Sequence, residues 1–272
     1  MVKLCAFGEP SVYAADGTRL DGVARHTKRF ALFLYLACHQ RERPRRRDEL
    51  MAVFWPEADG HRGRNCLRQA LYVLKEGMVP GILVSSGEHE VSVDPTRMEC
   101  DVTQFLLALR EGALETALRL HSGDFLQGFF LPGAPEFGFW AEELRARLRV
   151  LAAHAAKNLA HTAEGEKALS NALFWWRRTM ELTPFDEGVI RRVMALLAGS
   201  GNRCEALAEF NRFRDRMESE LGLEPSRRTL NLASLVSSAP PDQIPMWVGD
   251  RRRKPSPDPA SPWRRAVERS PG

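Results

Sequence analysis

The stretch that decides the fold is RNCLRQALYVLKEG, residues 64–77. At 100° per residue its apolar side chains share one side, which predicts an amphipathic helix packed on a core. That side holds Leu67, Leu71 and Leu74, with Cys66, Ala70 and Met78 beside them. The opposite side holds Arg62, Asn65, Gln69, Tyr72 and Glu76, with Arg64, Arg68 and Lys75 on the flank. Since any surface helix has a polar side, the helix alone favours a solvated face.

The neighbours of this helix change that interpretation. RRRDELMAVFW, residues 45–55, predicts a shorter helix before it, and the halves ILVS (82–85) and EVSVD (90–94) predict a β-hairpin after it. Helix, loop, helix and hairpin is the order of a winged helix-turn-helix, whose second helix enters the DNA major groove. An arginine-rich helix N-terminus suits a phosphate, and asparagine or glutamine pairs with adenine. We therefore predict that Asn65, Gln69 and Tyr72 read bases, and that phosphates are bound by Arg45, Arg46, Arg47, Arg62, Arg64, Arg68 and Lys75.

The rest of the first segment mixes strands with a helix. VKLCAF (2–7) and PSVYAADGTRL (10–20) predict short strands, with a turn at Asp16-Gly17. TKRFALFLYLACH (27–39) has apolar residues at helical spacing. The segment from residue 1 to 97 thus has the size of one small domain.

The second segment, residues 101–236, is predicted to be almost wholly helical. It contains helical pairs and an internal echo at a spacing of 38: Ala160 corresponds to Ala198, and Ala172 to Phe210. Small residues at helix crossings followed by a proline are typical of tetratricopeptide-like repeats, which build concave binding surfaces. The third segment, residues 237–272, is rich in proline and arginine, and we expect disorder there.

Composition limits the classes of function. The 272 residues suggest two domains, and 44% hydrophobic with 27% charged residues is ordinary for a soluble protein. The five cysteines are odd in number, and no metal-ligand spacing is present, so we expect reduced thiols in a cytoplasmic protein without a metal. No nucleotide-binding or catalytic motif and no apolar run long enough for a membrane span appear. These features predict neither an enzyme nor a cofactor.

Several phrases carry a resemblance to a known family. The run TKRF…RDEL…FWPEAD…RNCLRQAL…ILVSSGEHEVSVD resembles an OmpR-type winged-helix domain of the Streptomyces antibiotic regulatory protein (SARP) family. CDVTQF, GDFLQGFFLPGAPEFGFWAEELRARL and ELTPFDEGVIRRVMALLAGSGNRCEALAEFNRFRDRMESELGLEPS resemble that family's bacterial transcriptional activator domain. The resemblance covers roughly residues 1–236 in the same order.

This resemblance implies a sequence-specific activator that binds double-stranded promoter DNA at repeats and recruits the RNA polymerase holoenzyme. It adds Val73 to the base-reading positions, where the side chain meets a thymine methyl or only packs. It also makes Glu57 and Asp59, in the loop WPEADGHRG (55–63), the candidates for polymerase contact. A homodimer on DNA is one arrangement that it allows.

Other interpretations stay open. Lys75 replaces the family's arginine, and the hairpin carries Glu88 and Glu90, which favours a protein-interaction scaffold built on the helical repeats. An RNA-binding regulator is a third class. The run RRRK (251–254) adds non-specific DNA affinity or is a solvated tail. The aromatic-rich stretches 125–140 and 174–176 are either helix-packing core or partner sites.

Overall fold

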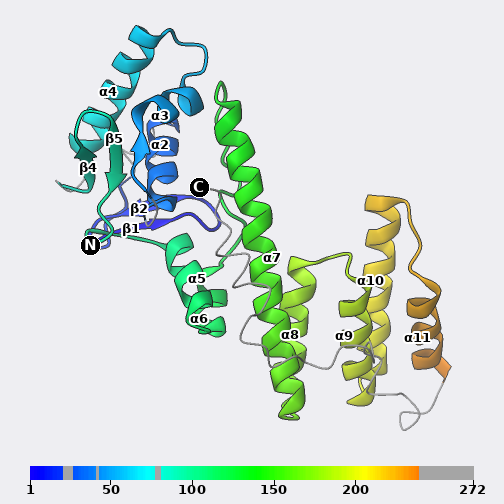
Figure 1. Cartoon of the computed structure of the whole chain (residues 1–272). Coiled ribbons are helices and arrows are strands. Elements are labelled where there is room, and N and C mark those ends of the chain that lie inside the picture. Colours follow the sequence, from blue (N-terminus) through cyan, green and yellow to red (C-terminus); the bar gives the residue numbers. More distant parts are fainter. Residues whose placement is uncertain (21–26, 41–42, 77–80, 239–272) are drawn as a thin grey trace. The chain divides into compact units, whose positions relative to one another are not determined.

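The computed structural model describes residues 1–20, 27–40, 43–76 and 81–238. The tail predicted to be disordered begins at residue 237, but residues 237 and 238 are helical, so that limit was wrong by two residues. The rest of the tail, with the RRRK run, lies outside the described residues, as does Met78. The chain divides into two compact units, Met1–Arg149 and Val150–Gly272. Figure 1 shows a chain dominated by helices, with its strands confined to the N-terminal part. The predicted fold class, mainly helical with a small β component, is confirmed.

The first unit contains two three-stranded sheets. In one, β1 (Val2–Cys5) lies between antiparallel β2 (Ser11–Tyr13) and parallel β6 (Met98–Cys100). In the other, β5 (Glu90–Val93) lies between β3 (Arg45–Arg46) and β4 (Leu83–Ser86), antiparallel to both. The predicted hairpin is present, with Ser86 paired to Glu90 across the turn. Sequence analysis did not predict β3 or β6.

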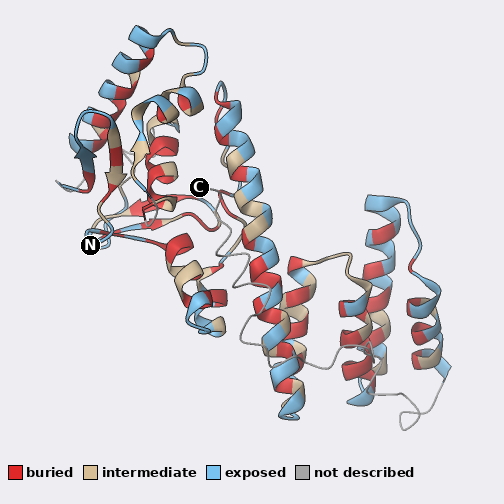
Figure 2. Ribbon diagram, in the orientation of Figure 1, coloured by how far each residue is buried: buried red, intermediate tan, exposed pale blue. Residues whose placement is uncertain are grey.

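Three helices pack with the second sheet. They are α2 (Thr27–Cys38), α3 (Arg47–Phe54) and α4 (Gly60–Glu76), and each contacts the other two. Their inner faces meet in an apolar core, shown as the inward-facing red bands of Figure 2. The largest fully buried side chains of that core are Phe30, Phe33, Leu34, Leu50, Phe54 and Leu67. Each fully buried side chain of this size contributes about 1.5–3 kcal/mol, so the core fixes how α4 lies against α2 and α3.

A carboxylate joins β1 to the helices that follow β6. Asp101 opens α5 (Asp101–Arg110), is buried, and accepts hydrogen bonds from the backbone N–H of Ala6 (2.8 Å), Phe7 (3.0 Å) and Val102 (2.8 Å). Helix α6 (Leu114–Leu120) packs on α5. The rings of Phe7 and Phe105 lie edge to face at 5.4 Å. The strand at the N-terminus and the helices after residue 100 therefore form part of one core.

The described residues of the second unit form helices joined by short loops. The unit comprises the second half of α7 (Pro135–Gly165), then α8 (Leu169–Leu182), α9 (Glu187–Gly199), α10 (Arg203–Leu221) and α11 (Arg227–Ser238). Successive helices pack on one another, and α9 contacts α8, α10 and α11. Helix α10 ends where Gly222 takes a left-handed conformation with φ 65°, a common helix stop.

The internal echo at a spacing of 38 marks helix-packing positions. Ala160 and Ala198 are fully buried, and so is Ala172, while Phe210 is 6% exposed. Small side chains let neighbouring helices approach closely, as the tetratricopeptide-like pattern predicts. Trp175 and Trp176 are buried, which makes them packing residues and leaves only Phe174 of that aromatic run exposed, at 60%.

Candidate nucleic-acid interface

Helix α4 is held by its apolar side, as predicted. Leu67, Ala70, Leu71 and Leu74 are each at most 5% exposed. Near the start of the helix, a β-carbon added to Gly63 would lie 3.4 Å from the Sδ atom of Met51. This is ordinary van der Waals contact, which shows that α4 begins close against α3. The anchored side leaves the opposite side of α4 in solvent.

The exposed side presents the three predicted base-reading residues together. Asn65, Gln69 and Tyr72 are all exposed, and 63% of Tyr72 is accessible. The amide nitrogen of Asn65 lies 3.4 Å from Nδ1 of His61, one turn earlier, so His61 joins this face. Val73 is half-buried at the edge. Their roles toward bases stay predictions, but their placement on one face agrees with the helical pattern.

Cations flank this face without neutralising partners. Arg62, Arg64, Arg68 and Lys75 are exposed, and the described part of the chain offers none of them an ion-pair partner. Four positive side chains on one 17-residue helix make an electropositive surface. Such a surface attracts a polyanion and can bind it by displacing its counterions.

The arginines before α3 differ from the expectation. Helix α3 begins at Arg47, whereas Arg45 and Arg46 form strand β3, because their backbone pairs with Val91 and Glu90. Arg46 is exposed and lies 3.8 Å from the Asp48 carboxylate. Arg47 is half-buried and its backbone N–H donates to the carbonyl of His89 (2.7 Å). Of the three, Arg46 is thus the best placed to meet a phosphate.

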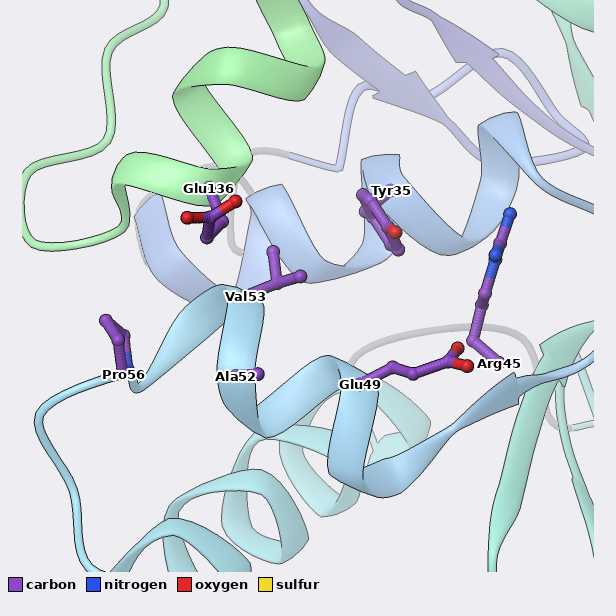
Figure 3. A pocket seen from close by; sticks show the side chains of 7 residues that line it. All are labelled: Tyr35, Arg45, Glu49, Ala52, Val53, Pro56 and Glu136. Carbon is purple, nitrogen blue, oxygen red and sulfur yellow. The ribbon is translucent and has the colours of Figure 1, made fainter. Parts of the chain in front are cut away.

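Arg45 is directed into a groove rather than outward into open solvent. Its guanidinium lies over the ring of Tyr35, 5.9 Å from the ring centre. Figure 3 shows the Arg45 side chain rising beside α2, with the carboxylate of Glu49 turned toward it. Sequence analysis did not find this groove, because its residues come from α2, β3, α3, the loop after α3, and α7.

The loop between α3 and α4 is shorter than predicted. Residues 60–63, expected in the loop, form the first turn of α4. Asp59 caps that turn, because its carboxylate accepts from the backbone N–H of His61 (3.0 Å) and Arg62 (2.8 Å). The hydrogen bond from Arg62 is the main cause that lowers the pKa of Asp59. Glu57 is exposed, whereas the carboxylate of Asp59 already has a structural role.

The hairpin turn is exposed and acidic on its surface. Gly87 takes a left-handed conformation with φ 62°, which lets the chain reverse, and Glu88 and His89 are exposed. Because β5 pairs with β3 as well as β4, the hairpin is fixed to the segment that begins α3. Strand β4 of the hairpin also contacts α4.

A known protein family matches the chain from the end of β5 into α11. A family model described as the bacterial transcriptional activator domain matches residues 93–236, more than half of the 272 residues. The chain belongs to the bacterial transcriptional activator domain family. No curated protein matches this chain in sequence.

A solved structure resembles this bacterial transcriptional activator domain protein over most of its length. It is Mycobacterium tuberculosis EmbR, determined in complex with a low-affinity phosphopeptide, with a TM-score of 0.56 and 17% sequence identity. The match covers 87% of this chain but 65% of EmbR, so this chain spans less than two thirds of that protein. At this identity the likeness shows a shared fold.

The residues that the family model matches and the two compact units have different limits. The match begins at residue 93, within β5, whereas the compact units meet between Arg149 and Val150. The domain boundary expected between residues 97 and 101 stays a prediction. None of the helices in the described ranges is long and apolar enough to cross a membrane.

Proposed function

We propose that this chain is a sequence-specific DNA-binding transcriptional regulator, an activator of the SARP type with an OmpR-type winged helix. The observation that carries the proposal is the outer face of α4, where Asn65, Gln69 and Tyr72 lie among four cations without ion-pair partners in the described residues. Membership of the bacterial transcriptional activator domain family supports a regulatory role. We propose no catalytic activity. We place the protein in the cytoplasm, where promoter DNA lies.

In this proposal α4, the flanking cations and the hairpin have different roles in DNA binding. Helix α4 lies in the major groove with Asn65 and Gln69 toward base edges, which they can pair with bidentately. The flanking cations and Arg46 bind phosphates and set the register of the protein on the duplex. The hairpin approaches the neighbouring groove, where Glu88 weakens the contact by repelling phosphates. RNA polymerase is the partner that the activator recruits.

The test is a gel-shift series on DNA from upstream of the protein's own gene, with random duplex as competitor. Wild type should prefer one promoter fragment at physiological salt. Changing Asn65 or Gln69 to alanine should cost about 1–3 kcal/mol, concentrated on single base pairs of the site. Changing Arg64 to alanine should weaken binding to every sequence and flatten the slope of log affinity against log salt by about 0.9.

The control is Arg110→Ala, an exposed arginine of α5 on a different surface, which should leave both affinity and slope unchanged. If wild type binds no upstream fragment better than random duplex, the activator proposal is wrong and a protein-interaction scaffold takes its place. A preference for RNA over duplex DNA would instead indicate the RNA-binding class.

A further inference from the structure

The first half of α7 presents an exposed face that its packing does not use. Glu136, Phe139 and Glu143 are spaced by three and four residues, so they share one side of the helix. All three are exposed, and 70% of the Phe139 side chain is accessible. Burying a phenylalanine normally contributes about 1.5–3 kcal/mol. The ring of Phe139 lies in water between two carboxylates, and its burial by a partner would contribute to the affinity of that partner.

A groove adjoins this face and shares Glu136 with it. The groove has a volume of about 600 Å³ and is lined by Tyr35, Arg45, Glu49, Ala52, Val53, Pro56 and Glu136. In Figure 3, Glu136 comes from the start of α7 and stands above Val53 and Pro56 of the α3 region. The groove thus offers apolar and aromatic surface, with the cation of Arg45 at one end, Glu49 paired with Arg43, and the carboxylate of Glu136 at the α7 side. Together, the groove and the residues Glu136, Phe139 and Glu143 are called the α7 face below.

The charge of the α7 face selects the partner. Within the described residues, neither Glu136 nor Glu143 has an ion-pair partner. Their neighbour Glu142 differs, because it pairs with Arg145, which also donates from Nε to the carbonyl of Phe125 (2.7 Å). The two unpaired carboxylates leave an excess of negative charge around an exposed ring. A complementary segment carries lysine or arginine beside apolar side chains.

The α7 face is held rigidly within the first unit. Phe137 and Trp140, on the inner side of the same helix, pack on Phe54 (ring centres 5.5 Å apart) and Tyr35 (4.8 Å). Arg149 pairs with Asp124, which fixes the helix to the connector before it. Aromatic contacts of this kind contribute beyond their buried area. A partner bound to the α7 face would therefore keep a defined position relative to α3 and α4.

We propose that the α7 face docks a basic, apolar segment of RNA polymerase holoenzyme. This inference rests on the proposed function and names the surface through which it acts. It also moves the main contact away from the loop that contains Asp59, whose carboxylate is occupied as the cap of α4. Glu57 of that loop lies one residue from Pro56 of the groove, so it can extend the contact.

The experiment uses the full chain, purified RNA polymerase holoenzyme and the promoter fragment found by gel shift. Phe139→Ala and the double variant Glu136→Gln with Glu143→Gln should bind DNA within twofold of wild type. Both should lower run-off transcription at least fivefold, and both should weaken the direct binding of polymerase to immobilised protein without DNA. Restoring one carboxylate at a time should recover part of each signal.

A matched control lies in the second unit. Phe174 of α8 is 60% exposed, and Glu166 is an exposed carboxylate in the loop before that helix. Phe174→Ala with Glu166→Gln should leave transcription and polymerase binding unchanged. Circular dichroism melts of every variant verify that the helices have formed, and the charge-neutral glutamines limit disturbance of the first turn of α7.

Three results would overturn the inference. One is run-off transcription at the wild-type level with the α7-face variants. Another is an equal loss of transcription with the α8 control variant. The third is a change from dimer to monomer in light scattering when the α7 face is altered, which would make the face a contact between two copies of this chain. If wild type fails to bind promoter DNA, the proposed function fails, while the binding of polymerase to immobilised protein still decides this inference.

Discussion

Replacing Glu164 with glutamine should remove a pH-dependent part of the stability of the helical second unit. Glu164, near the end of α7, has a side chain that is 8% exposed. Its carboxylate accepts from Nε1 of Trp176 on α8 (2.7 Å) and from Nε of Arg192 on α9 (2.5 Å). One carboxylate thus ties three successive helices together.

The magnitude follows from the pKa. Burial alone would raise the pKa of Glu164, but the hydrogen bonds from His161, Arg192 and Trp176 and the charge of Arg192 outweigh it and lower the pKa from 4.5 to about 2. Since the folded pKa lies below the unfolded one, the stabilisation is complete above pH 4.5 and is lost as the pH falls toward 2. This lowering of the Glu164 pKa corresponds to roughly 3 kcal/mol of folding free energy at pH 7, which solvent screening reduces to about 2 kcal/mol.

Urea unfolding of the full chain at several pH values between 7 and 3 measures this contribution. Wild type should lose about 1 kcal/mol more than Glu164→Gln over that interval, because the rest of the loss lies between pH 3 and 2, and the variant should be the less stable of the two at pH 7. Glu166→Gln, at an exposed carboxylate two residues later, is the control and should follow wild type. The reasoning is refuted if wild type and Glu164→Gln lose stability in parallel as the pH falls.

Two further predictions concern α4. Leu71→Ala, at a side chain that is 5% exposed, should lower the free energy of unfolding by about 2–5 kcal/mol in urea titrations, and a loss below about 1 kcal/mol would contradict the packing described. Asp59→Ala should lower the melting temperature at pH 7, because it removes the cap of α4. Since the pKa of Asp59 is lowered by its N–H donors, the difference from wild type should shrink as the pH falls through that pKa, and a constant difference across all pH values would exclude the capping role.

Local periodicity predicted the elements that depend on nearby residues. The placement of Leu67, Leu71 and Leu74 against Asn65 and Gln69 followed from the spacing of one helix, and the structure has the same two sides. The hairpin followed from two short apolar runs around a glycine. In both cases the signal lies within about 15 residues, where side-chain pattern and backbone geometry are directly linked.

Contacts between distant segments were missed. Strand β6 pairs in parallel with β1 across nearly the whole first segment, and no local pattern marks such a partner. Arg45 and Arg46 were expected in a helix, but pairing with the distant β5 makes them a strand. The α7 face and its groove likewise depend on helices that meet only in the folded chain. The proposed base and phosphate contacts remain predictions, because they concern a partner rather than the fold.

The hydrogen bonds that Asp101 accepts from Ala6 and Phe7, called the Asp101 clasp below, decide where the chain can be cut into fragments. A fragment cut at residue 97 would lack strand β6 and the carboxylate that receives the N–H groups of Ala6 and Phe7. Two buried donors would lose their acceptor, β1 would lose a neighbour, and the ring of Phe7 would be uncovered. Such a fragment should precipitate or unfold even though it contains every residue proposed to touch DNA. A fragment that extends to Arg149 keeps the clasp, and is the smaller piece from which DNA binding should be measured.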